Sequence, residues 1–222
     1  AGRLDDVLPT DRGPISVAFL PDLRGVDLRL TARGVGADEA REWLDRVEEA
    51  LAPVVGPYRF EAASGDIVEA VSTALAAAGR MMATAESCTG GLVAQRMTGR
   101  PGSSRIFRGG VVAYADDVKT ALLGVDPDDL RREGAVSAAV ARGMALGACR
   151  VFDAEAGVGI TGIAGPEGGS ADKPVGLVWY AVALDGRVEA RRRIFPGDRT
   201  AVRERSAQAA LALLLGCLEG TP

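Results

Sequence analysis

The chain has 222 residues, of which 47% are hydrophobic and 25% charged, the proportions of an ordinary soluble globular protein. Its net charge of −4 and its pI of about 5.1 argue against a generic DNA- or RNA-binding protein, which usually has a basic surface. No apolar run approaches the roughly 20 residues that a membrane-spanning helix needs, and no signal peptide opens the chain. We therefore expect a cytoplasmic protein with neither membrane nor nucleic-acid partners.

The absence of histidine and the scattered cysteines restrict the chemistry further. Without histidine there can be no Ser-His-Asp triad and no Cys-His dyad, so proton transfer is left to Lys, Asp, Glu, Tyr or water. The three cysteines, Cys88, Cys149 and Cys217, lack the paired spacing of a disulfide framework or a zinc site. We expect neither a metal nor a cofactor.

Residues 14–61 predict a small α/β module of strand, strand, helix and strand. Val26–Leu30 alternates apolar and charged residues, as a half-buried strand does. Apolar residues recur at helical spacing over positions 43–51, and Pro53 with the Gly-Pro pair that follows is expected to end this helix. Tyr58–Phe60 is predicted to form one further strand.

From Ser64 onward, predicted strands and helices alternate. The strands are expected at residues 80–85, 110–114, 156–161, 175–184 and 187–195. Three helices are expected to start after the capping residues Asp66, Ser137 and Asp198. Asp185-Gly186 predicts a hairpin within this alternation, and residues 175–184, apolar on both faces, predict a central strand. We predict an α/β fold whose mixed sheet has helices on both faces in three layers, with domains at residues 1–62 and 63–222.

The segment Ala85–Gly91 (AESCTGG) is predicted to join a buried strand to a helix. Free backbone N–H groups and the helix dipole at such a junction favour an anion or a developing oxyanion. Ser87 and Thr89 place hydroxyls there, while Gly90 and Gly91 let a ligand approach the backbone closely. Taken alone, the same residues are explained by helix capping.

A second segment, ending in YADDVK, carries serine, tyrosine and lysine. A Pro-Gly turn presents Ser103 and Ser104, and a strand then leads to Tyr114 and Lys119. A buried lysine can serve as the base for a serine when burial or a nearby positive charge favours its neutral form. Taken alone, a solvated helix lysine and an ordinary strand aromatic are the simpler interpretation.

Two further segments carry candidate ligand-binding residues. Gly157–Gly169 contains the pattern GxGxxG, but its glycines fall inside the predicted strand, so we reject a dinucleotide fold. The loop after that strand is expected to surround a substrate, with Thr161 and Gly162 at its edge. The turn FPGDR leads into a capped helix with Arg199 and Arg203, which suit a phosphate and exposed salt bridges equally well.

Read in this order, these segments resemble the CinA (competence/damage-inducible protein) family. The matching strings are AESCTGG, PGSS, GGVVAYADDVK, GAVS, GITGIAGPEGG, KPVG and FPGDR, spread over about residues 65–218. Residues 14–61 resemble the small KH-type module that precedes this domain in longer members; it has no basic GxxG loop, so RNA binding is not expected. Longer members carry a further N-terminal domain similar to molybdopterin-binding proteins, so we expect this chain to be a fragment.

The resemblance implies an amidohydrolase that converts nicotinamide mononucleotide to nicotinate mononucleotide and ammonia in pyridine-nucleotide salvage. It also implies self-association and a Ser/Lys mechanism. Carried onto this sequence, the base is Lys119 with Tyr114 beside it, and the nucleophile is Ser104 or Ser87, with Ser104 preferred. The expected substrate-binding residues are Glu86, Thr89, Gly90, Ser103, Thr161, Gly162 and, at the phosphate, Arg199 or Arg203.

Two other classes of function stay open. The first is a nucleotide-binding regulatory module without catalysis, although pure binding does not need a serine–tyrosine–lysine set. The second is a nucleic-acid-binding protein connected with competence, which the acidic pI disfavours. Release of ammonia from nicotinamide mononucleotide separates the first alternative from an amidohydrolase.

Overall fold

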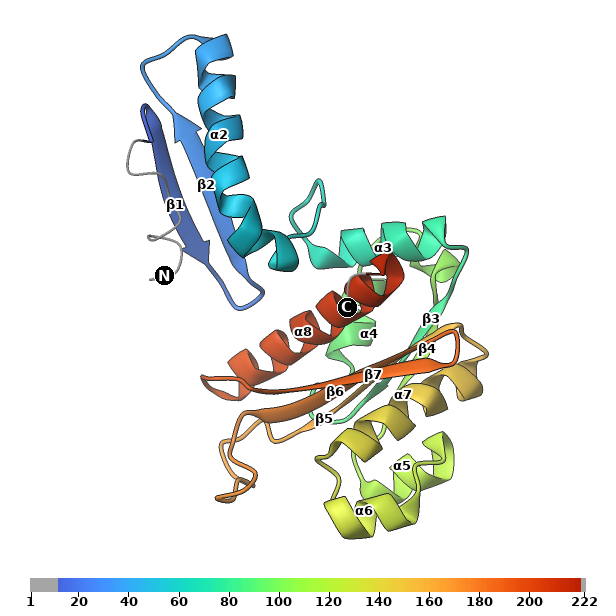
Figure 1. The fold of residues 1–222 in the computed structure, drawn as a ribbon. Coiled ribbons are helices and arrows are strands. Elements are labelled where there is room, and N and C mark those ends of the chain that lie inside the picture. The colour runs from blue at the N-terminus through green and yellow to red at the C-terminus, as the bar shows by residue number, and fades with distance from the viewer. Residues whose placement is uncertain (1–11, 221–222) are drawn as a thin grey trace. The chain divides into compact units, whose positions relative to one another are not determined.

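The computed structural model describes residues 12–220, and the chain divides into two compact units, Ala1–Glu61 and Ala62–Pro222 (Figure 1). In the described part of the first unit, two antiparallel strands pack against one helix. These elements are β1 (Ile15–Pro21), β2 (Val26–Ala32) and α2 (Ala37–Val55). The core of this unit is formed by Ile15, Val47 and Leu51.

The predicted third strand of this unit is wrong. Gly56–Tyr58 forms a short 3-10 turn, which the Arg59 N–H closes by donating to the Gly56 carbonyl at 3.1 Å. Pro53 does not end the helix either, because it lies within the last turn of α2, which continues to Val55. The Gly-Pro pair thus predicts where α2 ends, but it does not predict the 3-10 turn that follows.

The second unit contains a five-stranded mixed sheet in the order β4-β3-β5-β6-β7. The parallel strands are β3 (Met82–Glu86), β4 (Phe107–Val112) and β5 (Ala156–Gly162). The antiparallel strands are β6 (Leu177–Leu184) and β7 (Arg187–Ile194). Asp185 and Gly186 join these last two with φ values of 49° and 80°, as a two-residue hairpin turn requires, and β6 lies inside the sheet. The predicted hairpin and mixed sheet are confirmed.

Helices cover both faces of this sheet, so the predicted three-layer arrangement is also confirmed (Figure 1). One layer contains α3 (Ile67–Ala77), α4 (Leu92–Thr98) and α8 (Arg199–Glu219). The opposite layer contains α5 (Asp116–Leu123), α6 (Pro127–Glu133) and α7 (Ala138–Phe152). Within residues 12–220, no helix combines the length and the apolar character that crossing a bilayer requires.

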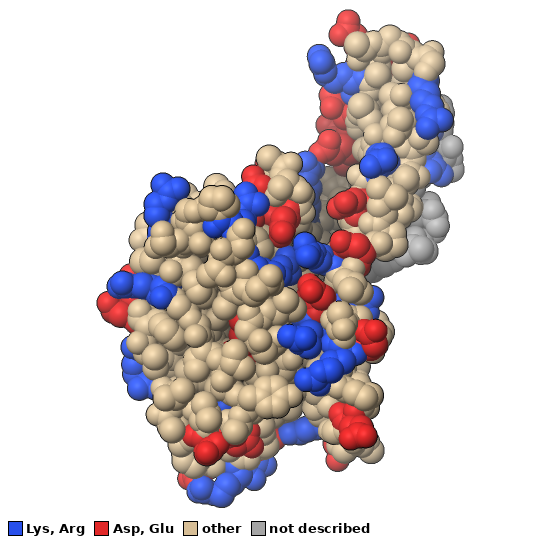
Figure 2. Space-filling view, turned by 180° about the vertical axis from the view of Figure 1, so that it is seen from behind, with Lys and Arg blue, Asp and Glu red and all other residues tan. Residues whose placement is uncertain are grey.

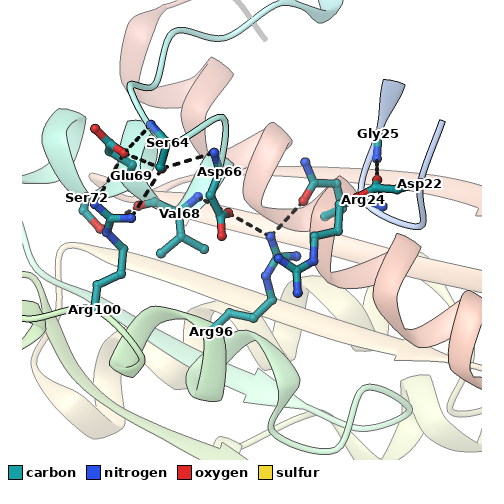
Figure 3. A network of polar contacts seen from close by, with 11 residues as sticks. Asp22, Arg24, Gly25, Ser64, Asp66, Val68, Glu69, Ser72, Arg96 and Arg100 are labelled. Carbon is teal, nitrogen blue, oxygen red and sulfur yellow. Dashed lines mark hydrogen bonds and ion pairs between the residues drawn. The ribbon is translucent and has the colours of Figure 1, made fainter. Parts of the chain in front are cut away.

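The predicted caps fix where three of these helices begin. Asp66 accepts a hydrogen bond from the Val68 N–H at 3.0 Å, and Ser137 and Asp198 act in the same way on α7 and α8. Oε2 of Glu69 accepts a hydrogen bond from the Ser64 N–H at 3.0 Å. Nη2 of Arg96, in α4, forms an ion pair with Oδ1 of Asp66 at 3.2 Å (Figure 3). These contacts tie the start of the second unit to its own helices.

The glycines of the GxGxxG pattern allow α7 to pack closely on the sheet. A Cβ added to Gly157 would lie 2.1 Å from the carbonyl oxygen of Ala145, and one added to Gly159 would lie 2.4 Å from that of Ala141. The pattern therefore serves helix–strand packing inside β5, which agrees with rejecting a dinucleotide fold. On the face shown in Figure 2, basic and acidic side chains are interspersed within each unit.

Candidate active site

The carboxyl ends of β3 and β4 form a topological switch point in the sheet. The connection after β3 runs through α4 on one face, whereas the connection after β4 runs through α5, α6 and α7 on the other (Figure 1). In open α/β sheets, ligands bind in the crevice outside such a point. The chain segments that follow these two strands are therefore the first place to look for a site.

Ser87 begins the turn that joins β3 to α4. Its N–H donates to the Ile160 carbonyl of β5 at 2.9 Å, and its own carbonyl accepts the Gly90 N–H at 3.0 Å, which closes a four-residue turn. Ser87 is buried, with 8% of its surface exposed, and within residues 12–220 its hydroxyl makes no hydrogen bond. A serine on a sharp strand-to-helix turn is the arrangement that presents a nucleophile in many hydrolases.

Two backbone donors of this turn are unused. Cys88 and Thr89 occupy its central positions, whose N–H groups a β-turn does not employ. Neither N–H donates to another residue in the described part of the chain, and the Cys88 N–H meets only its own thiol. The buried Thr89 hydroxyl likewise has no partner there. The turn therefore offers polar groups that could stabilise a negative charge beside Ser87.

Glu86 is not available to a substrate, in contrast to the expectation from sequence. Its side chain is fully buried, and its two oxygens accept the N–H groups of Val93 at 3.1 Å and Ala94 at 2.9 Å. A carboxylate there compensates the positive end of the α4 dipole. The anion-binding capacity predicted for the start of this helix is thus occupied by the protein's own side chain, and only the preceding turn stays open.

Among the residues that the structure describes, Lys119 is the largest fully buried side chain, with 1% exposed. Its Nζ donates to the carbonyl oxygen of Tyr114 at 3.0 Å and to Oδ1 of Asp116 at 2.9 Å. The interpretation of Lys119 as a solvated helix lysine is therefore wrong. Tyr114 lies beyond the end of β4, and its ring is largely exposed at the crevice.

The pleat of β3 indicates which face of the sheet Ser87 meets. Ala83 and Ala85 belong to the same core cluster as Leu123 of α5, whereas Glu86 points to the opposite face, toward α4. Ser87 follows the last residue of the strand, and from this alternation we infer that its side chain faces the α5 side. Because the Ala113 N–H donates to the Glu86 carbonyl at 2.9 Å, the chain segment that leads to Tyr114 runs beside Ser87.

The two predicted arginines connect the start of α8 to the loops of the crevice. Arg199 donates through Nη1 to the Gly165 carbonyl at 2.8 Å and through Nη2 to the Tyr114 hydroxyl at 3.2 Å. Arg203 donates through Nε at 3.2 Å and Nη2 at 2.7 Å to the Thr89 carbonyl. A Cβ on Gly90 would lie 3.4 Å from the same Nη2, so the turn and Arg203 are in close contact.

Thr161 and Gly162 support the loop after β5 from inside. The Thr161 hydroxyl donates to the Ala135 carbonyl at 2.8 Å, and its side chain is buried. A Cβ on Gly162 would lie 2.7 Å from a methyl group of Val178. Both residues stand near the crevice, yet their described contacts are made within the protein.

Ser103 and Ser104 lie at the opposite end of β4 from Lys119. They belong to a 3-10 turn (Ser103–Arg105) at the start of this strand, where the Ile106 carbonyl accepts the Met82 N–H at 2.8 Å. The six residues of β4, about 20 Å long at roughly 3.3 Å per residue, follow before the chain reaches Tyr114. Within one chain β4 therefore separates Ser104 from Lys119, and this geometry does not support the preference for Ser104.

The cysteine beside Ser87 is not a competing nucleophile at neutral pH. Burial raises the pKa of the Cys88 thiol to about 12, an effect that Arg199 and Arg203 oppose only in part. The thiol therefore stays protonated, and thiolate is the reactive form. No group of three His, Cys, Asp or Glu side chains within residues 12–220 is arranged to hold a metal ion.

Comparison with known proteins agrees with this architecture. The sequence profile described as the CinA C-terminal domain matches residues 65–218, and that of the damage-inducible protein CinA KH domain matches residues 1–60. The chain belongs to the CinA family. A CinA-like protein from Gemmatimonas aurantiaca is 45% identical over 211 residues, which cover 95% of this chain and 49% of that protein.

Other CinA relatives give the same result. A putative competence-damage inducible protein from Moorella thermoacetica is 46% identical over 94% of this chain and 50% of its own length. The chain thus spans about half the length of these curated relatives. The crystal structure of the competence/damage inducible protein CihA from Agrobacterium tumefaciens is 42% identical, with a TM-score of 0.66, over 72% of this chain and 99% of that one. A CinA superfamily protein from Klebsiella pneumoniae gives 35% identity and a TM-score of 0.67, over 69% and 96%.

Proposed function

We propose that this chain hydrolyses the carboxamide of nicotinamide mononucleotide to a carboxylate and ammonia, with Ser87 as the nucleophile. The observation that carries the proposal is the turn after β3. It presents a serine hydroxyl without a partner next to two unused backbone donors, on the face of the sheet that holds Lys119. Membership of the CinA family supports an enzyme, and the choice of this amide as substrate rests on the resemblance described above.

The proposed reaction proceeds through an acyl-enzyme. Lys119 in its neutral form takes the proton of the Ser87 hydroxyl, whose oxygen attacks the carboxamide carbon. The N–H groups of Cys88 and Thr89 stabilise the tetrahedral oxyanion, where losing one donor typically costs about 3–4 kcal/mol. The C–N bond breaks as the lysine returns the proton to the departing nitrogen, which leaves as ammonia. Water then hydrolyses the serine ester and releases the carboxylate.

The nucleotide phosphate is proposed to bind near the start of α8. A guanidinium has five N–H donors, and Arg199 and Arg203 each use two of theirs on protein oxygens in this structure. The remaining donors stay available to an anion. This contact would let the phosphate position the carboxamide, because binding energy from a remote group of the substrate is used at the reacting centre.

Ammonia release is the experiment that tests this function. The purified chain should release ammonia from nicotinamide mononucleotide, and much more slowly from the riboside and from free nicotinamide, which lack the phosphate. Full activity after exhaustive chelation is expected from a serine–lysine mechanism. Binding of the nucleotide without ammonia release would instead support a regulatory nucleotide-binding module.

A further inference from the structure

Asp116 contacts the buried amine of Lys119 from the edge of the site. It is the first residue of α5, its Oδ1 lies 2.9 Å from Nζ of Lys119, and the two residues are one helical turn apart. The Asp116 side chain is 60% exposed whereas that of Lys119 is only 1% exposed. The buried amine of Lys119 therefore contacts a carboxylate that faces solvent. This amine is the group of the lysine side chain that can exchange a proton.

The other ionisable groups of the neighbouring elements are engaged elsewhere. Glu86 at the end of β3 gives both oxygens to α4, and the Tyr114 hydroxyl after β4 accepts from Arg199. On α5 itself, Asp117 accepts the Val118 N–H at 2.9 Å. The α7 residues in the same core cluster as Leu123 of α5 are apolar, and the guanidinium of Arg150, also in α7, lies at Gly124, beyond the end of α5. Asp116 is therefore the carboxylate that pairs with Lys119 among the described residues.

A carboxylate in this position favours the ammonium form of the lysine, whereas a general base must be neutral. We propose that Asp116 is a positioning residue that holds Lys119 protonated at the Tyr114 carbonyl and thereby sets the lower pH limit of activity. The effect on activity rests on the proposed function, in which Lys119 is the base. The effect on the charge of Lys119 does not, because it follows from the contact alone.

The pH profile of kcat/KM tests the effect on activity. Asp116→Asn removes the negative charge with almost no change in shape, so the acidic limb of the profile should move to lower pH by about one unit or more. Asp117→Asn is the matched control, since it removes a neighbouring carboxylate that does not touch the lysine. Asp116→Glu should restore much of the original profile. Identical profiles for the two asparagine variants would overturn the proposal.

A second measurement reads the charge of Lys119 without any turnover. The sequence contains two lysines, Lys119 and Lys173, so NMR of lysine-labelled protein gives two side-chain signals that Lys173→Arg assigns. In Asp116→Asn the Lys119 signal should titrate at lower pH than in the parent protein, while the Lys173 signal stays unchanged. An unmoved Lys119 signal would contradict the proposal whatever the activity. If the signal moves but no ammonia is released from the nucleotide, the pairing stands and the proposed reaction fails.

Discussion

The side chain of Arg203 donates two hydrogen bonds to the backbone carbonyl of Thr89, although 114 residues separate them along the chain. A guanidinium can make both contacts at once because its donors form a rigid planar fork. The contact joins the first turns of α8 to the turn that carries Ser87. It fixes the peptide group next to the two backbone N–H groups that are proposed to bind the oxyanion.

Arg203→Lys should lower kcat more than it raises KM. The ammonium of lysine keeps the charge but cannot reproduce the paired contact with the Thr89 carbonyl. Hydrogen bonds to a charged group contribute about 1.5–3 kcal/mol, which corresponds to a loss of roughly 10- to 100-fold. Steady-state kinetics on this variant and on Arg187→Lys, at an exposed position of β7, provide the comparison. A loss confined to KM would assign Arg203 to substrate binding alone.

The buried Cys88 thiol should make the protein less stable at alkaline pH. Its pKa in the folded protein is about 12, above the ordinary value of 9.0, with burial as the main cause. Between these two values the unfolded chain loses the proton while the folded chain keeps it. The free energy of unfolding therefore falls as pH rises, by up to about 1.4 kcal/mol per pH unit from this group, and the contribution is complete below pH 9.

Urea unfolding at pH 8 and pH 10.5 measures this effect. Cys88→Ala lacks the titrating group, so it should lose less stability than the parent protein between the two pH values. Cys149 and Cys217, whose pKa values burial raises to about 11, contribute equally to both proteins. Equal losses in parent and variant would show that the thiol ionises at its ordinary pH in the folded state.

Glu86→Gln should destabilise the fold and leave substrate affinity little changed. The glutamine side chain has one oxygen, which can accept only one of the two N–H groups of α4, and its amide NH2 faces the second. Losing a hydrogen bond to a buried charged acceptor costs about 1.5–3 kcal/mol of the free energy of unfolding. Glu167→Gln, in the exposed loop after β5, is the matched control. Thermal unfolding together with KM separates the two roles. An unchanged unfolding temperature with a large rise in KM would instead show that Glu86 binds the substrate.

Much of this fold follows from local sequence signals, and the failures have physical reasons. The caps at Asp66, Ser137 and Asp198 and the hairpin at Asp185 were predictable because each depends on a few adjacent residues. The conformation near Tyr58 was not predictable in this way, because a strand forms only where it can hydrogen-bond to the edge of a neighbouring strand. Ser104 and Lys119 lie at opposite ends of β4, as the order of turn, strand and lysine along the chain already implied.

The site residues show the same limit. Ser87 and Lys119 could be selected by type and motif, but the pairing of Lys119 with Asp116 depends on side-chain packing around α5. The occupation of the α4 N-terminus by Glu86 has no sequence signal beyond a carboxylate before the turn. Pleat and register, which decide the face that each side chain meets, are fixed only once the whole sheet has formed.

Gly159→Ala should be strongly destabilising. Its new methyl group would lie 2.4 Å from the carbonyl oxygen of Ala141 and force α7 away from β5, at a cost of about 3 kcal/mol. Gly99→Ala is the control, because Gly99 has ordinary helical φ and ψ values and its nearest neighbours would be 3.4 Å away. Chemical denaturation compares the two. A tolerated Gly159→Ala would mean that α7 does not approach the sheet as closely as described.

The most direct test of the proposed site compares ammonia release by the parent chain, Ser87→Ala and Ser104→Ala. All three should be folded by circular dichroism, since both serines have hydroxyls without hydrogen-bond partners in the described part of the chain. With Ser87 as nucleophile, its alanine variant should lose nearly all release of ammonia from nicotinamide mononucleotide, while Ser104→Ala stays within a few-fold of the parent. An active Ser87→Ala, or an inactive Ser104→Ala, would contradict a site built at the carboxyl ends of β3 and β4 within one chain.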